Sequence, residues 1–532
     1  MARDSGDRVD RRELLKYLGV GSLTAASAGC MGGSPPAGGG GGENGSGGNA
    51  SGGGGGGGDA LAAAQEVGFA DNWKDRRMAS LDEWPLEKRE QIPPEGKRSD
   101  VKPWRNSGAV KSAPWSPPDG WEETPAGDVE KLQILNFGSL DYDPATVATY
   151  AMFEEATGIE IEPLEIVVDQ AVSKEAAFLS ANKGQPQGFL VVTGQSLTSF
   201  VQNGYLQQVD PVMGEEEMWD PYLSLAENNF QIDGHTYLSP NINEGSLVHT
   251  RPKLMRENGV DDETVQRILD GEYDWNDMET VMEAFKGTGI AGWAYRGASL
   301  VYTVRDWMKM FYQAGGQIVG DDGTVTFNSE AGIVALQKMV EWREKGLVPK
   351  EVVNYTQGDL ADGFLSGQIA MVPVFGDLVP RAVEQHGKAP NYRPTVQPKG
   401  GESAPNPKRR GIAAPTGFGI NVNADVGHKL AAMLYMDARW SVPSGWFEFV
   451  VEGNQTYAKD VYDQASETDA ALFADVRGRA VENNVQEIYP QSRTIRQTLS
   501  EELQTAIAGD KSPEEALNAV QEFADTVLGQ NE

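Results

Sequence analysis

The chain has almost no cysteine, because Cys30 is the only one in 532 residues. A single cysteine excludes an intrachain disulfide and any metal site built from several thiolates. Histidine is nearly as rare, and its four residues are scattered: His235, His249, His386 and His428. The sequence contains no HExxH, no GxSxG and no phosphate-binding GxxxxGK[ST] motif. We therefore expect no catalytic residue, no metal and no cofactor, and a chain that is not an enzyme.

Positive charge is also scarce. The 45 lysines and arginines face 78 acidic residues, which gives a net charge of -33. The acidic excess is spread along the chain, as is typical of a solvated surface. Nucleic acid and anionic lipid are therefore not expected as partners. An evenly acidic, cysteine-poor composition resembles that of proteins from salt-loving archaea, in which carboxylates keep the surface hydrated in concentrated salt.

The N-terminal apolar stretch is short. Residues Leu14 to Ala28 fall below the roughly 20 strongly apolar residues that span a bilayer. They follow Arg11-Arg12, which resembles a twin-arginine (Tat) signal, and they end in Ala28-Gly29-Cys30, which resembles a lipobox with Ser27 in place of the usual leucine. Residues 1–29 are therefore predicted to be a Tat-type lipoprotein signal. Lipid on Cys30 would anchor the protein at the extracellular face of the cell membrane.

Two unusual segments follow. Residues 30–58 are nearly all glycine and predict a flexible tether that would hold the body on the order of 25–30 Å from the membrane. Residues 59–130 are rich in proline and tryptophan, and we expect an N-terminal arm that packs some of its tryptophans on the body. The about 400 residues from Lys131 onward are too many for one core and predict two domains.

The body begins with alternating strand and helix patterns. Strands are predicted at 132–137, 159–164 and 189–192, and helices at 144–157 and 174–181. This order is typical of an α/β fold with a parallel sheet covered on both faces, in which ligands bind at the carboxyl ends of the strands. Further helices are predicted after Asn328 or Ser329 and after Ser512, which are residues that can cap a helix, and along the apolar stripe of Ile495, Leu499, Leu503 and Ile507.

A series of short segments then runs in order through residues 131–530. It consists of Phe153–Ile159, Gly204–Leu206, Val209–Pro211, Ile232–Pro240, Ala314–Gly316, Val325–Ser329, Gly346–Pro349, Phe364–Met371, Gly417–Ile420, Leu499–Leu503 and Lys511–Leu517. No single segment is specific, but the ordered series resembles family 1 extracellular solute-binding proteins of ABC importers, of the sugar-binding type.

The resemblance implies a two-lobed fold like that of type II periplasmic binding proteins, with the ligand in a cleft between the lobes. Lobe 1 would hold residues 131–245 with 418–452, and lobe 2 would hold 246–417 with 453–530. Three chain crossings would act as hinges, near residues 241–245, 413–417 and 453–456. Ligand contacts from both lobes would then favour the closed state.

Residue type and position select the candidate ligand-binding residues. Polar side chains that follow a strand or lie in the first crossing suit hydroxyl groups, and aromatic faces stack on sugar C–H groups. Each aromatic residue alone is as readily explained as core, and each carboxylate as solvated surface. The candidates are Thr193, Gln195, Asn241, Asn243, Glu244, Trp293, Tyr295, Tyr302, Asp306, Trp307, Phe375 and Asp377.

The sequence therefore predicts a monomeric, membrane-anchored receptor that delivers a small solute to ABC permease subunits. A sugar or oligosaccharide is favoured. A polyamine or another cationic solute is the alternative, favoured if Glu244, Asp306 and Asp377 converge. A secreted glycan hydrolase and a sensory receptor that presents its ligand to a membrane kinase are further alternatives.

Overall fold

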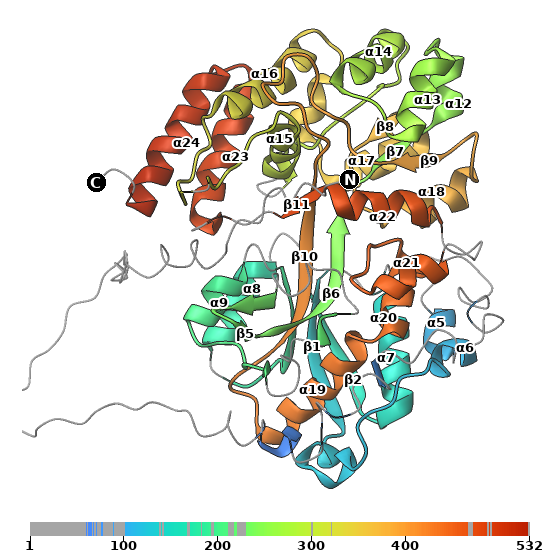
Figure 1. The fold of residues 1–532 in the computed structure, drawn as a ribbon, viewed down its shortest axis with the longest axis vertical. Coiled ribbons are helices and arrows are strands. Elements are labelled where there is room, and N and C mark those ends of the chain that lie inside the picture. The colour runs from blue at the N-terminus through green and yellow to red at the C-terminus, as the bar shows by residue number, and fades with distance from the viewer. Residues whose placement is uncertain are drawn as a thin grey trace, which may run out of the picture.

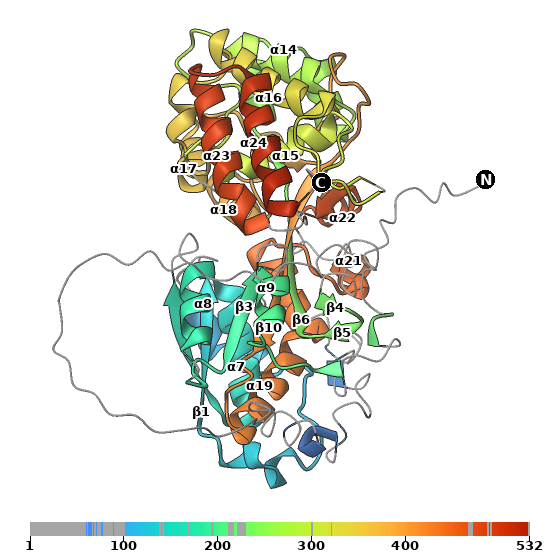
Figure 2. The same ribbon diagram turned by 90° about the vertical axis from the view of Figure 1, so that its left-hand side faces the viewer.

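A computed structural model describes residues 102–529 except 138–139, 141–142, 167–170, 182, 193–195, 211–217, 221–229, 299–301, 321, 466–471, 487–488 and 490–491, together with residues 60, 62–65, 68, 71, 76, 77, 84 and 89. The signal, Cys30 and the tether lie outside the described residues. The described chain forms two lobes along the long axis of the molecule, joined by strands β6 and β10 (Figures 1 and 2). The α/β class and the two-lobed fold predicted from the sequence are confirmed.

The first lobe is built on a sheet in the order β11-β10-β3-β1-β2, with β6 paired to β10. Strand β1 is parallel to β2 and β3, as the strand–helix alternation predicts, whereas β10 runs antiparallel to β3 and β6. The strands are β1 (Lys131–Phe137), β2 (Glu160–Ile166), β3 (Gly188–Val192), β6 (Leu238–Gly245), β10 (Gly411–Ile420) and β11 (Asn484–Gln486). A short hairpin, β4 (Gln231–Ile232) and β5 (His235–Thr236), precedes β6.

The helices of this lobe start and stop where the sequence provides caps. Helix α7 begins after Asp143, whose side chain accepts from the backbone N–H of Thr146, and ends at Gly158 with φ 73°. The helices are α7 (Pro144–Thr157), α8 (Ala171–Ser180), α9 (Thr198–Gln202), α19 (Val426–Arg439), α20 (Val442–Trp446), the π-helix η9 (Phe447–Glu452) and α21 (Lys459–Ala465).

The N-terminal arm is part of the first lobe's core. Four of its five tryptophans (Trp84, Trp104, Trp115, Trp121) are buried in the first-lobe cluster. Arg77 donates to the buried carboxylate of Asp437 in α19 at 2.6 Å, Arg76 at 3.3 Å, and the indole N–H of Trp115 at 2.9 Å. Its short helices are α5 (Lys102–Asn106), α6 (Gly108–Lys111), η2 (Trp121–Glu123) and η3 (Pro125–Asp128).

The second lobe packs mostly helices around a small antiparallel sheet in the order β8-β7-β9. Ser329 caps α16, and Ser512 and Glu515 form a capping box at α24, both as predicted. The elements are β7 (Val248–Thr250), β8 (Met371–Val372), β9 (Arg393–Thr395), α12 (Pro252–Glu257), α13 (Asp262–Asp270), α14 (Trp275–Phe285), α15 (Tyr302–Gln313), α16 (Glu330–Glu344), η8 (Lys350–Asn354), α17 (Gln357–Ser366), α18 (Leu378–His386), α22 (Ala474–Asn483), α23 (Ser492–Ala508) and α24 (Pro513–Leu528).

The chain crosses between the lobes three times. Strand β6 begins with Leu238 in the first core, and Ile412 and Phe418 place the two ends of β10 in different cores. The third crossing differs from the expectation. Tyr457, Val461 and Ala465 pack in the first lobe, whereas Leu472 and Val476 pack with second-lobe residues. Residues 453–465 therefore belong with lobe 1 and not with lobe 2, because their apolar side chains are buried against α20 and η9.

Among the described residues, no helix is both long and apolar enough to cross a bilayer.

Candidate functional site

A buried cluster of charges lies at the start of α15. Arg296 donates to Asp306 Oδ2 from its backbone N–H (2.7 Å) and from Nε (3.0 Å), and to Oδ1 from its terminal nitrogen (2.5 Å). Lys309, one turn along α15, donates to Oδ1 of Asp306 and to the carbonyl oxygen of Pro373, both at 2.8 Å. Asp306 and Lys309 are each 3% exposed and Arg296 is fully buried. This cluster ties α15 to the segment that follows β8.

Two cations share one carboxylate in this cluster. Burial alone would raise the pKa of Asp306, but Arg296 and Lys309 outweigh it and the pKa is lowered to about 2. Burial also lowers the pKa of Lys309 to about 7, because desolvation of the ammonium and the positive charges of Arg296 and Arg305 outweigh the attraction of Asp306. Asp306 is therefore ionised and committed to its partners. Its role as a ligand contact stays a prediction, and in this structure its two oxygens accept from Arg296 and Lys309.

Two aromatic rings pack against the guanidinium groups of Arg296, which also belongs to the charged cluster, and of Arg305. We call these four side chains the aromatic–arginine cluster: Tyr302, Phe375, Arg296 and Arg305. The guanidinium carbon of Arg296 is 4.6 Å from the ring centre of Tyr302 and 5.6 Å from that of Phe375. Arg305 lies 5.9 Å and 5.6 Å from the same two rings. Cation–π contacts of this length hold the rings in place. Tyr302 is partly exposed, and Phe375 is 4% exposed.

His249 fixes the backbone of Phe375. Its Nε2 lies 2.9 Å from the carbonyl oxygen of Phe375, and its Nδ1 lies 2.9 Å from the hydroxyl of Tyr392. Because a carbonyl only accepts, Nε2 carries the proton and Nδ1 accepts from Tyr392. Burial lowers the pKa of His249 to about 4, so the ring is neutral near pH 7. The position of Phe375 is therefore set by β7 as well as by the two arginines.

The segment that follows Phe375 touches the first lobe. A Cβ placed on Gly376 would lie 2.1 Å from the carbonyl oxygen of Gly453, at the end of η9. Asp377 comes next and stands at the N-terminus of α18 without capping it. Its Oδ1 is enclosed and has no hydrogen-bond partner, and burial raises the pKa of its carboxyl group. The aromatic–arginine cluster and Asp377 thus lie at the face of the second lobe that meets the first.

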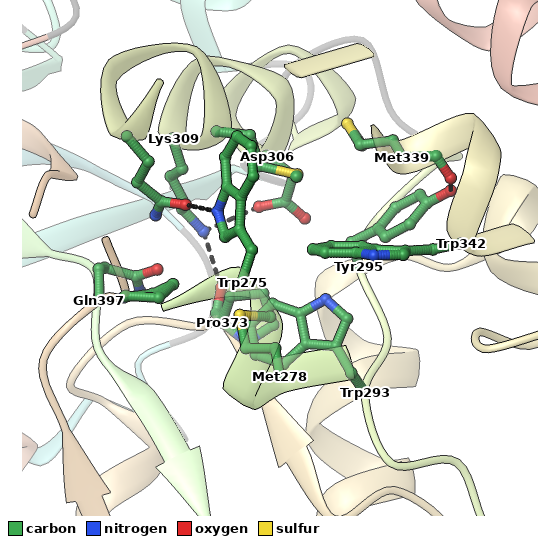
Figure 3. Close-up of a pocket in the computed structure, with 13 residues that line it drawn as sticks. Trp275, Met278, Trp293, Tyr295, Asp306, Lys309, Met339, Trp342, Pro373 and Gln397 are labelled. Atoms are coloured by element: carbon green, nitrogen blue, oxygen red, sulfur yellow. Dashed lines mark hydrogen bonds and ion pairs between the residues drawn. The ribbon is translucent and has the colours of Figure 1, made fainter. Parts of the chain in front are cut away.

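Two other predicted aromatic contacts lie in the interior of the second lobe. Trp293 and Tyr295 line a small cavity together with Trp275 and Trp342, as Figure 3 shows. The cavity volume is about 20 Å³, room for roughly one water molecule and too small for a sugar. Tyr295 is 2% exposed and donates its hydroxyl to the carbonyl oxygen of Met339. Both residues are buried in the second-lobe core, and the expectation that they form a ligand platform stays a prediction.

Trp307 is likewise in the second-lobe core, and its role as a ligand contact stays a prediction. It is fully buried on α15, and its indole N–H donates to the carbonyl oxygen of Gly332 at 3.2 Å. Every residue from Thr303 to Gln313 is buried, so this helix packs on all sides. No side of it except the one at Tyr302 is available to a ligand.

The first crossing carries Asn241, Asn243 and Glu244 on β6. Asn241 is 7% exposed and Asn243 is 1% exposed. The side-chain oxygen of Asn241 and both amide atoms of Asn243 are buried without a hydrogen-bond partner. The backbone N–H of Asn243 donates to the carbonyl oxygen of Gln455, which follows η9 in the first lobe, at 2.9 Å. The two asparagines therefore lie inside the hinge. Glu244 is paired with Ala414 of β10, and its side chain lies outside the description.

Thr193 and Gln195 lie outside the described residues, as does Cys30. The structure adds Arg296, which the sequence did not single out as a site residue. Arg296 stands next to Tyr295 in the sequence, but its partner Asp306 is ten residues away and only the fold joins them. Within the part of the chain that the structure describes, no group of His, Cys, Asp and Glu is arranged to hold a metal ion.

The sequence and the fold both match known proteins. The family model described as "Bacterial extracellular solute-binding protein" matches residues 141–438, which is more than half of the chain. The same region contains the aromatic–arginine cluster, Asp306 and Asp377. No curated protein matches the sequence.

Among solved structures, the fold is similar to maltose-bound MalE3 of T. maritima, with a TM-score of 0.66, 17% identity, and coverage of 75% of this chain and 99% of that one. A solute-binding protein from Thermotoga lettingae bound with α-D-tagatose gives a TM-score of 0.66 at 18% identity, covering 75% of this chain and 100% of that one. An ABC substrate-binding protein from Listeria monocytogenes in complex with cycloalternan gives 0.64 at 16% identity, with 76% and 100% coverage. At these identities the similarity concerns the fold.

The family match over residues 141–438 and the similarity to two-lobed solved structures over about three quarters of the chain agree. The chain belongs to the family of bacterial extracellular solute-binding proteins.

Proposed function

We propose that this protein is the receptor of an ABC importer at the outer face of the cell membrane, anchored by lipid on Cys30, and that it binds a sugar or oligosaccharide between its lobes. It acts by binding and delivery to permease subunits, without chemistry on the solute.

Separating cells into membrane and medium fractions tests the lipid anchor. The anchor is contradicted if a Cys30→Ser variant stays with the membrane.

The aromatic–arginine cluster carries the proposal. A partly exposed ring, Tyr302, stands at the lobe face that meets the first lobe, and Arg296 and Arg305 hold it in a fixed orientation. A sugar presents an apolar C–H face that stacks on such a ring and hydroxyl groups that bind nearby polar side chains. Asp377, two residues after Phe375, has a carboxylate oxygen without a hydrogen-bond partner that can accept from a hydroxyl group. The maltose, tagatose and cycloalternan of the similar structures support a carbohydrate.

A cationic solute such as a polyamine is the weaker alternative. Convergence of Glu244, Asp306 and Asp377 would favour a cationic solute. The charge of Asp306, however, is already matched by Arg296 and Lys309. Of the two among these three carboxylates whose side chains are described, that leaves Asp377. Titration calorimetry of the full chain against maltose, tagatose, a chitin oligosaccharide and spermidine separates the two. We expect binding of at least one sugar and none of spermidine, and the reverse result would overturn the proposal.

Tyr302→Ala is expected to weaken binding of that sugar about tenfold or more, which corresponds to roughly 1.4 kcal/mol, because the stacking face is lost. The side chain is partly exposed, so folding should be little affected. Tyr237→Ala, a partly exposed tyrosine beside β5 in the first lobe, is the control and should bind as the wild type does. Equal affinity in both variants would show that Tyr302 does not contact the sugar.

A further inference from the structure

Four asparagines stand in the sequence pattern Asn-x-Ser/Thr, which is the acceptor motif for an N-linked glycan. Two of them, Asn44 and Asn49, lie outside the described residues. The other two, Asn354 and Asn454, lie in the body, and each is followed two residues later by a threonine. A glycan is large and polar, so on a folded chain only an asparagine that projects into solvent can accept it.

Asn454 is enclosed by the first lobe. It is 7% exposed, and its side-chain amide donates to Oε2 of Glu448 at 3.0 Å. The other oxygen of this carboxylate accepts from Arg439 at 2.9 Å. Gln455 and Thr456, which complete the motif, are at most 2% exposed. A sugar on the side-chain nitrogen of Asn454 would have to displace these buried neighbours, so this motif is closed in the folded chain.

Asn354 has the opposite surroundings. It is the last residue of η8, it is exposed, and its side chain makes no hydrogen bond with any residue that the structure describes. Tyr355 and Thr356, which complete the motif, have extended backbones, with φ -78° and ψ 128° at Tyr355 and φ -90° and ψ 178° at Thr356. Thr356 is exposed as well. The motif therefore lies at the surface, in the turn between η8 and α17.

This turn is held in place without the side chain of Asn354. Thr356 and Asp359 form a capping box at the start of α17, in which the hydroxyl of Thr356 donates to Oδ2 of Asp359 at 2.7 Å. The carbonyl oxygen of Tyr355 accepts from the backbone N–H of Ala298 at 3.2 Å. A group attached to the side-chain nitrogen of Asn354 would therefore extend into solvent and leave these hydrogen bonds intact.

We propose that Asn354 carries an N-linked glycan and that Asn454 does not. The inference rests on the proposed export of the protein. A twin-arginine signal directs chains that are already folded, so a transferase at the outer face of the membrane meets the folded surface. The side-chain nitrogen of Asn354 displaces a saccharide from its lipid phosphate carrier. A C–N bond forms at the anomeric carbon, the C–O bond to the phosphate breaks, and the nitrogen loses one proton to a base of the transferase.

Tryptic peptide masses test the proposal on the protein purified from the cells that produce it. Trypsin cuts after lysine and arginine, so residues 351–381 carry Asn354 as their one motif, and residues 440–459 carry Asn454 as theirs. The two remaining motifs fall on a third peptide, which ends at Lys74. We expect the first peptide to be heavier than its amino-acid sequence by whole sugar residues. The second should have the mass of its sequence.

Three variants identify the attachment point. In Asn354→Gln the added mass on residues 351–381 should be lost. Thr356→Ala should lose it as well, although the asparagine remains, whereas Thr356→Ser keeps both the motif and a hydroxyl that can cap α17 and should keep the added mass. Residues 351–381 found only at the mass of their sequence overturn the proposal, as does added mass that persists in Asn354→Gln. A glycan on residues 440–459 would mean that the chain is modified before it folds, and it also overturns the proposal.

The same peptide masses separate this failure from a failure of the proposed function. A protein that is not exported keeps residues 1–29, whereas an unmodified Asn354 in a protein that has lost them is a failure of this inference alone. Failure to bind any sugar in calorimetry would contradict the proposed ligand and leave the peptide masses unchanged.

Discussion

Replacing Asp306 by asparagine is expected to lower the free energy of unfolding by about 3–5 kcal/mol, because it leaves Arg296 and Lys309 buried without their shared carboxylate. Both cations are at most 3% exposed, and neither can reach water without disturbing α15. Denaturant unfolding, followed through the tryptophans of the second lobe, measures the loss. Because α15 and the segment after β8 would both shift, affinity for the solute should fall as well.

Asp262→Asn is the matched control. Asp262 also pairs with an arginine, Arg256 at 2.6 Å, but its side chain is 86% exposed. An exposed pair contributes about 0–1 kcal/mol, so the control should be nearly as stable as the wild type. Similar stabilities of the two variants would contradict the assigned role of Asp306.

The same account predicts a pH dependence of the free energy of unfolding. The stabilisation from Asp306 is present above its ordinary pKa of 3.8 and is lost as the pH falls through about 2.

Replacing Asp437 by asparagine is expected to release the N-terminal arm and to destabilise the first lobe by about 3–5 kcal/mol. Asp437 is fully buried and accepts hydrogen bonds from Arg76, Arg77 and Trp115. Burial raises its pKa, but Arg77 and Arg76 outweigh that effect and the pKa is lowered. The asparagine removes the charge that two buried guanidinium groups share. Limited proteolysis should then cut within residues 59–130 well before the body.

Glu155→Gln tests whether this effect is specific to the buried site. Glu155 pairs with Lys111 of the arm at 3.2 Å, and both side chains are well exposed, at 54% and 39%. Loss of this pair should change stability by about 0–1 kcal/mol and leave the arm protected. An arm that is cut equally fast in both variants would show that Asp437 does not hold it.

Much of the fold follows from local patterns. The strand and helix alternation from β1 to β3 was predicted because apolar spacing and glycine stops are local signals, and Gly158 ends α7 with a positive φ. The third crossing, predicted near residues 453–456, follows residue 465 in the structure. The boundary there depends on which of the two cores buries Tyr457 and Val461. The sequence shows that these side chains are apolar but does not show in which lobe they are buried.

The site was harder to predict than the fold. Tyr302, Tyr295 and Trp307 lie close together in the sequence, but only Tyr302 is partly exposed, because α15 is enclosed on every other side. Asp306 was selected as a ligand contact because a carboxylate suits a hydroxyl group. Its partners lie ten residues before it and three after, and no pattern distinguishes a paired carboxylate from a free one.

The central claim is that a sugar is held between the two lobes at the aromatic–arginine cluster. Hydrogen–deuterium exchange of the full chain, with and without the sugar that binds in calorimetry, tests it directly. We expect protection of Tyr302–Gln313 and of residues 375–377 in the second lobe, together with protection of first-lobe segments around Asp143 and Glu452. Protection confined to one lobe, or protection that leaves Tyr302 and Phe375 unchanged, would contradict the account.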